Sequence, residues 1–161
     1  MSTLLSNKGG DGATSYASVE DADDYFELVF GAEEWIEIDD DTKERLLATA
    51  TQMIERLTPV CDKADSAQAL NFPCATNEYL GVEDDGFDNA KKACMMQAIF
   101  LFQNQDAISE ARVNKIQGVT SETIGPTSKT MTGYNPLMKW APGVLSLLAP
   151  YVELDQVVRR G

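Results

Sequence analysis

The sequence of 161 residues contains no histidine and only three cysteines. Without histidine the chain cannot form a Ser-His-Asp triad, use an imidazole base or bind a metal through imidazole. Cys61, Cys74 and Cys94 are odd in number and form no C-x-x-C pair, which argues against a structural zinc site. We therefore predict buried or half-buried reduced thiols.

Long apolar runs are also missing. The longest, at residues 93–102, spans about ten residues, which is about half of what a helix needs to cross a bilayer. Met1–Ser15 lacks the apolar segment of a signal peptide. These absences predict a soluble chain that is made inside the cell and has no membrane partner.

Basic residues are scarce, because 13 lysines and arginines stand against 26 aspartates and glutamates, for a net charge of −13. Half of the acidic side chains lie in residues 1–44, where Lys8 and Lys43 are the only basic ones, so this quarter carries −11. Such a field repels phosphate backbones. Nucleic-acid binding by a basic surface is therefore not expected.

The motifs of catalysis and metal binding are absent as well. Gly9-Gly10-Asp11-Gly12 lacks the Lys-Ser/Thr that completes a phosphate-binding loop. The acidic runs at 39–41 and 83–85 lack the alternating ligands of a calcium loop, which favours helix capping and solvation. We predict no catalytic, cofactor-binding or metal-binding residue, and hence no enzyme and no cofactor.

The segment Asp88–Gln105 is expected to organise the fold. Its residues 93–102 are apolar except for Gln97. A helix that is apolar over most of its circumference must be covered on several sides. A buried β-strand is the alternative for so short a run, but the Ala and Met content and the two preceding lysines favour a central helix.

Two amphipathic helices are predicted before this segment. Ser18 and the acids after it form a helix start signal, and apolar residues at helical spacing follow it until Gly31. A similar start at Asp41 precedes a second apolar series that reaches Leu57. Trp35, in the acidic loop between them, is expected to fill the core.

The pattern changes after Gln105. Alternating and β-branched residues in Ala111–Ile124 favour one or two strands, with a hairpin bend at Gln117-Gly118 as one arrangement. Residues 125–135 are rich in Gly, Pro, Ser and Thr and are expected to form a loop. Two short helices opened by proline are predicted between there and Pro150.

The predicted fold class is therefore mainly α. We expect a small helical bundle of about three to five helices, with a projecting β-strand, hairpin or long loop around residues 111–135. Residues 1–15 are predicted to be a flexible tail. Residues 16–150 would form the helical domain, with the insertion at about 106–135, and 151–161 a C-terminal tail.

Several short motifs follow one another in an order typical of one protein family. They are Ser15-Tyr-Ala-Ser-Val-Glu-Asp-Ala-Asp-Asp-Tyr-Phe26, Leu46–Leu57, Gln68-Ala-Leu-Asn-Phe-Pro73, the Ala-rich central helix, Lys-Ile-Gln-Gly-Val-Thr-Ser-Glu and Leu147-Leu-Ala-Pro-Tyr151. Over this range the chain resembles the small head–tail adaptor (connector, or head-completion) proteins of tailed bacteriophages. The branch with S-Y-x-S-V-E-D-A-D is often labelled DnaT-like single-stranded-DNA-binding protein. Cys74 stands where family members commonly have arginine.

The resemblance implies a structural virion protein of the neck, assembled in the host bacterial cytoplasm. As a homo-oligomer, a twelve-fold ring below the portal protein, it would extend the DNA channel and provide an attachment platform for a tail-side neck, terminator or nozzle protein. Double-stranded DNA would pass through without specific binding. The alternative function is a DNA-associated helper, either a DnaT-like ssDNA-binding protein or an acidic DNA mimic.

Three sets of residues are candidates for these contacts, since a closed ring needs interfaces between neighbours and an acidic lumen would let DNA slide. The candidate lumen acids are Glu20, Asp23, Asp24, Glu27, Glu33, Glu34 and Glu37. The candidate portal interface is the tail, with Tyr151, Val152, Leu154, Val157, Val158, Arg159 and Arg160. The candidate subunit-interface or tail-side loop contains Lys115, Ile116, Val119, Met131 and Tyr134.

Overall fold

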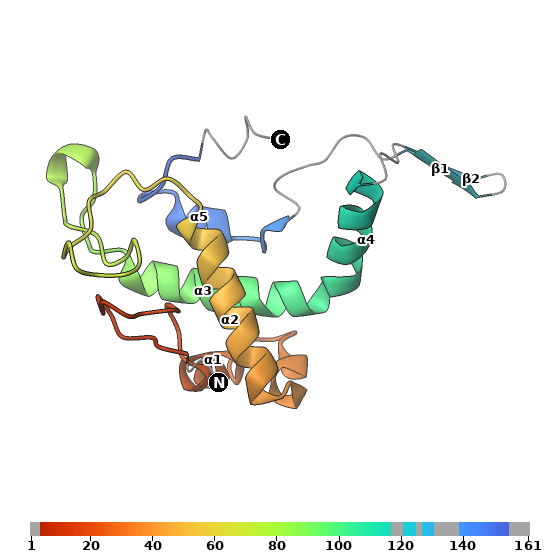
Figure 1. Ribbon diagram of the computed structural model, residues 1–161, viewed down its shortest axis with the longest axis horizontal. Coiled ribbons are helices and arrows are strands. Elements are labelled where there is room, and N and C mark those ends of the chain that lie inside the picture. Colours follow the sequence, from red (N-terminus) through yellow and green to blue (C-terminus); the bar gives the residue numbers. More distant parts are fainter. Residues whose placement is uncertain (1–3, 117–120, 125–126, 131–138, 155–161) are drawn as a thin grey trace.

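Helices dominate the part of the chain that the structure, a computed structural model, describes: residues 4–116, 121–124, 127–130 and 139–154 (Figure 1). In chain order the elements are α1 (Val19–Phe26), the 3₁₀ helix η1 (Glu33–Glu37), α2 (Asp40–Glu55), the 3₁₀ helix η2 (Glu78–Leu80), α3 (Phe87–Gln103), α4 (Gln105–Ile116), β1 (Ser121–Ile124), β2 (Thr127–Thr130) and α5 (Val144–Leu148). The predicted mainly α fold is confirmed.

The predicted central helix is α3, which packs against both α2 and α5 (Figure 1). Ala90, Ala93 and Ala98 are fully buried in it, and such small side chains let neighbouring helices approach closely. The residue that precedes the helix is Gly86, with φ +64°, and not Asp88 as the sequence suggests. A Cβ on Gly86 would lie 2.9 Å from the ring of Tyr151, so the close approach also requires glycine.

Gln97 is the polar residue in the apolar run, and its side chain hydrogen-bonds α3 to the backbone of residues 139–141. Its side chain is fully buried. Its Nε2 donates to the carbonyl of Lys139 at 2.8 Å, and its Oε1 accepts from the backbone N–H of Ala141, also at 2.8 Å. Because buried backbone groups need partners, this amide holds residues 139–141 in place before α5 begins.

The first predicted N-terminal helix begins at its predicted cap, Ser18, whereas the cap of the second lies two residues before the predicted Asp41. The Ser18 hydroxyl accepts from the backbone N–H of Asp21, and the Asp21 carboxylate accepts from that of Ser18, each at 3.0 Å. The Asp39 side chain caps α2. α1 ends at Phe26, one turn before the predicted stop at Gly31. Leu28 and Phe30 are therefore exposed, whereas Val29 still packs against the core.

The N-terminal segment and the long connection after α2 are tied to the body by polar contacts. Thr14 and Leu5 exchange backbone and hydroxyl hydrogen bonds that close a loop, and Lys8 reaches Asp85 at 2.6 Å. This arrangement of residues 4–15 differs from the expected flexible tail. In the connection, Gln68 is buried and donates to the carbonyls of two residues in its own turn.

The predicted strands at residues 111–116 are wrong, because α4 continues to Ile116. The helix formers Ala111, Arg112 and Lys115 outweigh the β-branched Val113 and Ile116 there. The hairpin lies further along, with β1 and β2 paired antiparallel from Ser121 with Thr130 to Ile124 with Thr127. In Figure 1 α4 turns away from the end of α3, and the hairpin lies beyond it, away from the other helices.

Candidate interaction surface

The first residues of the predicted C-terminal tail are part of the core. Tyr151 and Val152 are each 4% exposed. The backbone carbonyl of Tyr151 accepts a hydrogen bond from Val60 N–H at 2.9 Å, and Val152 forms an isolated antiparallel β-bridge with Pro59. The predicted C-terminal tail was expected to leave the helical domain at Tyr151, and this expectation is wrong for Tyr151 and Val152. Because both side chains are buried, they cannot contact a portal protein. Leu154 is half-buried.

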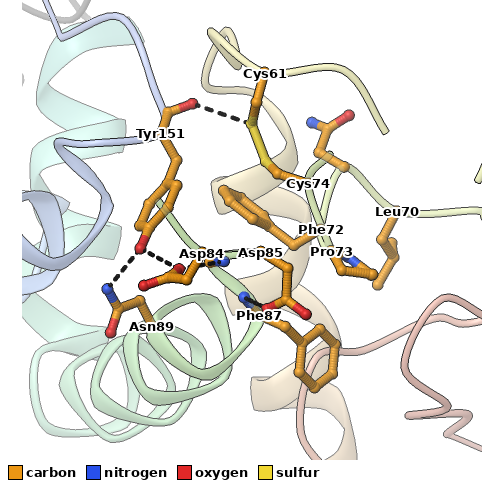
Figure 2. The surroundings of a disulfide bond; sticks show 12 residues. Cys61, Leu70, Phe72, Pro73, Cys74, Asp84, Asp85, Phe87, Asn89 and Tyr151 are labelled. Atoms are coloured by element: carbon orange, nitrogen blue, oxygen red, sulfur yellow. Dashed lines mark hydrogen bonds between the residues drawn. A yellow bond between two sulfur atoms is a disulfide. The ribbon is translucent and has the colours of Figure 1, made fainter. Parts of the chain in front are cut away.

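The Tyr151 side chain joins three segments, as Figure 2 shows. Its hydroxyl donates to Asp84 Oδ1 at 2.6 Å and accepts from Asn89 Nδ2 at 3.4 Å. Its ring meets that of Phe72 edge-on at 5.8 Å between centroids. Burial, together with the hydrogen bond to the Asp84 carboxylate, raises the pKa of Tyr151 to about 12. The phenol is thus held neutral as a structural donor.

A disulfide lies beside this contact, where the sequence had suggested reduced thiols. Cys61 and Cys74 are bonded, and the expectation is wrong for them. The bond links the chain just after α2 to the turn that ends at Pro73, and Cys61 Sγ lies 3.9 Å from the carbonyl oxygen of Tyr151 (Figure 2). Cys94 is a free, fully buried thiol as predicted, and burial raises its pKa.

Most of the candidate lumen acids are on the surface. The exposed ones are Glu20, Asp24, Glu27, Glu33, Glu34 and Glu37. Asp23 differs, because its Oδ1 accepts from Trp35 Nε1 at 2.7 Å and from the buried Lys43 ammonium at 2.9 Å. Lys43 Nζ also lies 5.7 Å from the centre of the Trp35 ring. Asp23 is thus a structural partner of the core rather than a free surface charge.

Two further lysines are paired with carboxylates. Lys91 donates to Asp21 at 2.7 Å, and Lys8 to Asp85 at 2.6 Å. Burial alone would raise the pKa of both carboxyls, but the hydrogen bonds from lysine and from backbone N–H groups outweigh it and lower the pKa. The same hydrogen bond to Asp85 raises the pKa of Lys8. Both ammonium groups therefore already have carboxylate partners within the chain.

Apart from Leu5, which is 43% exposed, the large apolar side chains that are exposed among the described residues lie in two places. Leu28, Phe30 and Ile36, next to or within η1, are 90%, 100% and 67% exposed. Tyr79 and Leu80, in η2, are 101% and 54% exposed. Single exposed apolar residues are ordinary, whereas contiguous exposed apolar patches are typical of contact sites. Neither group was expected from the sequence, because Phe30 continues a helical spacing and Tyr79 lies in an acidic loop.

A shallow apolar groove of about 200 Å³ lies beside the first group. It is formed between the α1–η1 segment, the C-terminal half of α3 and the residues before α5. Its lining consists of Tyr25, Phe26, Val29, Gly31, Ala32, Met96, Ile99, Phe100, Gln103, Ala141 and Pro142. Gln103 Nε2 donates to the carbonyl of Gly31 at 3.1 Å across this surface. We call this surface the α1–α3 groove.

The remaining candidates are only partly placed. Lys115 and Ile116 lie in α4, not in a strand or loop. Val119, Met131, Tyr134 and residues 157–160 lie outside the described residues.

Within the described ranges no cluster of Cys, Asp and Glu is placed to hold a metal ion. None of the helices in that part of the chain is long and apolar enough to cross a membrane. That the protein is not an enzyme stays a prediction.

These features describe a mainly helical protein whose described surface carries exposed acids, paired lysines and exposed apolar side chains. A family model described as "Putative DnaT-like ssDNA binding protein" matches residues 4–160, so the chain belongs to this family. The match agrees with the branch whose label the sequence suggested. No curated protein and no solved structure matches the chain.

Proposed function

We propose that this protein is a structural virion component, a head-to-tail adaptor that forms a twelve-fold ring below the portal. In this function it extends the DNA channel and provides the attachment platform for tail proteins. The observation that carries the proposal is the pair of exposed apolar sites, at Phe30 and at Tyr79, on loops fixed to the body. Exposed aromatic side chains of this kind are suited to protein partners.

The charge distribution supports the same function. The exposed acids of the α1–η1 segment belong to the quarter of the chain that carries −11 of the net charge. If several copies turned this segment toward a channel, their summed field would repel the DNA backbone and prevent it from adhering. Double-stranded DNA would then pass without specific binding, as an adaptor requires.

A second function, single-stranded DNA binding, is favoured by the family description, which supports it more directly than it supports the adaptor. The lysines weigh against it. DNA binding draws its affinity from basic groups that replace counterions on phosphates. Lys8, Lys43 and Lys91 already have carboxylate partners, and Lys63 donates to two backbone carbonyls. A DNA phosphate would have to displace these partners.

Two measurements on the full chain separate the functions. Mass photometry of the protein alone and mixed with its portal tests for rings or for a portal that gains a collar. Fluorescence anisotropy with a labelled single strand at several salt concentrations tests for DNA binding, which should weaken as salt rises. A collar with no change in anisotropy is the expected result. A chain that ignores the portal and binds DNA with a steep salt dependence would refute the adaptor function.

The matched control for portal docking is a chain that ends at Leu154. It keeps the buried Tyr151 and Val152 but lacks Val157, Val158, Arg159 and Arg160. If the predicted tail interface binds the portal, this shortened chain loses the collar while its far-UV circular dichroism and unfolding midpoint stay as in the full chain. A collar that forms equally well without residues 155–161 would assign portal binding to the body.

A further inference from the structure

The end of the described chain is held by backbone pairing with the segment just after α2. Two backbone hydrogen bonds, at 2.8 and 2.9 Å between nitrogen and oxygen, join residues 58–60 to residues 151–153 around an isolated antiparallel bridge. We call this arrangement the C-terminal pairing. So short a pair of extended segments is not stable by itself. Its persistence therefore depends on what fixes the two segments from outside.

The Cys61–Cys74 disulfide lies directly beside the C-terminal pairing. Cys61 is the next residue after the paired residues 58–60, and its Sγ lies 3.9 Å from the Tyr151 carbonyl oxygen (Figure 2). The backbone N–H of Cys74 donates to the Asp85 carbonyl at 2.8 Å. The bond therefore fixes the residue that follows the pairing to the part of the chain beside Asp85.

The side chain of Tyr151 rests on neighbours of the second cysteine. Its ring meets that of Phe72, two residues before Cys74, and its hydroxyl donates to Asp84 at 2.6 Å. The disulfide thus joins the segment that pairs with the Tyr151 backbone to the segments that contact its side chain. Without the bond, only noncovalent contacts hold together two positions that are 13 residues apart in the sequence.

Reduction of the bond requires the same region to open. The side chains of Cys61 and Cys74 are 6% and 2% exposed, and thiol–disulfide exchange needs a thiolate to reach one of the two sulfur atoms. Opening of the C-terminal pairing uncovers Cys61, because the Tyr151 carbonyl lies beside its sulfur. Coupling of this kind is reciprocal: if the disulfide stabilises the pairing, the pairing protects the disulfide.

We propose that Cys61 and Cys74 form a redox switch that controls the C-terminal pairing. In the disulfide form residues 151–153 are held on the body, and in the dithiol form they are released more readily. A low-molecular-weight thiol such as glutathione is the reductant. One thiolate forms a mixed disulfide with one cysteine and frees the other, and a second thiolate displaces the mixed disulfide. The two cysteines gain two electrons and two protons, while the two thiols become one disulfide, and oxidised glutathione reverses the reaction.

The switch also bears on residues 155–161, because they continue from the paired segment. The cytoplasm keeps thiols reduced, whereas a released particle meets an oxidising medium. The pairing would then be loose while the chain is made and assembled, and fixed afterwards. Only this consequence rests on the proposed function, since the switch itself needs neither portal nor DNA.

Hydrogen exchange measured by mass spectrometry on the full chain tests the switch. Samples treated with oxidised glutathione or with dithiothreitol are compared, and thiol titration after unfolding should count one free cysteine and three, respectively. In the reduced form the amides of residues 58–62 and 151–154 are expected to exchange at least about tenfold faster. Local exchange in α1 should be unchanged, because Asp23 of this helix contacts Lys43 in the first turn of α2, at the other end of α2 from Cys61.

Three outcomes would overturn the proposal. One is unchanged exchange in residues 151–154. Another is an equal acceleration in α1, because the bond would then support the whole fold and not the C-terminal pairing in particular. The third is a count of three free cysteines after treatment with oxidised glutathione, which would show that no bond forms.

The reciprocal effect is measured with a variant that keeps the disulfide. Tyr151→Phe loses the hydrogen bond to Asp84 but keeps the ring, so dithiothreitol is expected to reduce the bond about tenfold faster than in the wild type. Tyr79→Phe is the matched control, because it removes the hydroxyl of a fully exposed tyrosine and should leave the reduction rate unchanged. Equal rates for Tyr151→Phe and the wild type, or an equal acceleration by Tyr79→Phe, would contradict the coupling.

Both measurements use the chain alone, so their outcome does not depend on the portal experiment. A pairing that loosens on reduction in a chain that never forms a collar would retain this inference and refute the adaptor function. A portal collar formed by a chain whose hydrogen exchange ignores reduction would retain the adaptor function and refute the switch.

Discussion

Ending the chain at Pro150 is expected to unfold the protein, whereas ending it at Leu154 is expected to leave its stability unchanged. The perturbation is a stop codon at either position, and the difference is only the four residues 151–154. Tyr151 and Val152 are each 4% exposed, so both side chains lie in the core. The portion of the chain that looks like a free tail in the sequence is thus a structural element.

The magnitude follows from what these residues contact. Losing a buried aromatic side chain costs about 3–5 kcal/mol, and losing a buried valine about 1.5–3 kcal/mol. Two backbone hydrogen bonds are lost as well, from Val60 N–H to Tyr151 and from Glu153 N–H to Thr58, each worth about 1 kcal/mol. The sum exceeds about 5 kcal/mol, which is comparable with the whole stability of a small domain.

The assay is urea unfolding followed by far-UV circular dichroism for the two shortened chains and the full chain. The chain ending at Leu154 should unfold with the midpoint of the full protein, because every contact of Tyr151 and Val152 is retained. The chain ending at Pro150 should show no cooperative transition, or a midpoint far lower. Equal midpoints for the two shortened chains would refute the inference that Tyr151 and Val152 belong to the core.

Three other predictions concern stability. Replacing Cys61 and Cys74 by serine is expected to cost about 3 kcal/mol relative to the oxidised protein, and dithiothreitol should then change the urea midpoint of the wild type but not that of the variant. The pKa of Tyr151 is raised from 10.0 to about 12. The neutral phenol therefore contributes its full share to the free energy of unfolding below pH 10.0, and this stabilisation is lost as pH rises toward 12. Tyr151→Phe should therefore show a flatter decline of the unfolding midpoint across this range, and parallel declines would contradict the pKa assignment. Gln97→Leu leaves the N–H of Ala141 and the carbonyl of Lys139 without partners, at about 2–4 kcal/mol. A variant as stable as the wild type in thermal unfolding would show that these groups find other partners.

Local signals in the sequence were sufficient to predict α1, α2 and α3, but not α4, whose residues 111–116 were expected to form a strand. The capping box at Ser18 and the periodic apolar residues depend on contacts within one or two turns, so the start of α1 could be located from the chain alone, whereas the cap of α2 is Asp39 and not the predicted Asp41. The length and composition of residues 88–105 likewise identified α3. The end of α1 was harder, because Val29 and Phe30 continue the spacing although the helix stops at Phe26. The exposure of Phe30 was missed for this reason.

The incorrect predictions concern contacts between segments that are far apart in the sequence. Nothing near Tyr151 in the sequence indicates that its backbone pairs with Val60 or that its hydroxyl reaches Asp84. The Cys61–Cys74 bond depends on how the connection folds, and an odd number of cysteines gives no guide to pairing. The groove also combines three separate segments. These features require the tertiary structure, because their sequence separations are too large for any local pattern.

The position of the basic residues limits how the protein could bind DNA. Lys43 is buried against Asp23, and removing the partner of a buried charge is costly, so this lysine cannot turn to a phosphate without loss of stability. Lys91 and Lys8 would exchange one anion for another, with little net gain. A DNA-binding function would therefore depend mainly on basic residues outside these pairs, such as Arg159 and Arg160. The adaptor function draws instead on the acids and apolar side chains of the body. Removal of residues 155–161 therefore tests both functions, because it deletes the predicted portal interface and these two arginines together.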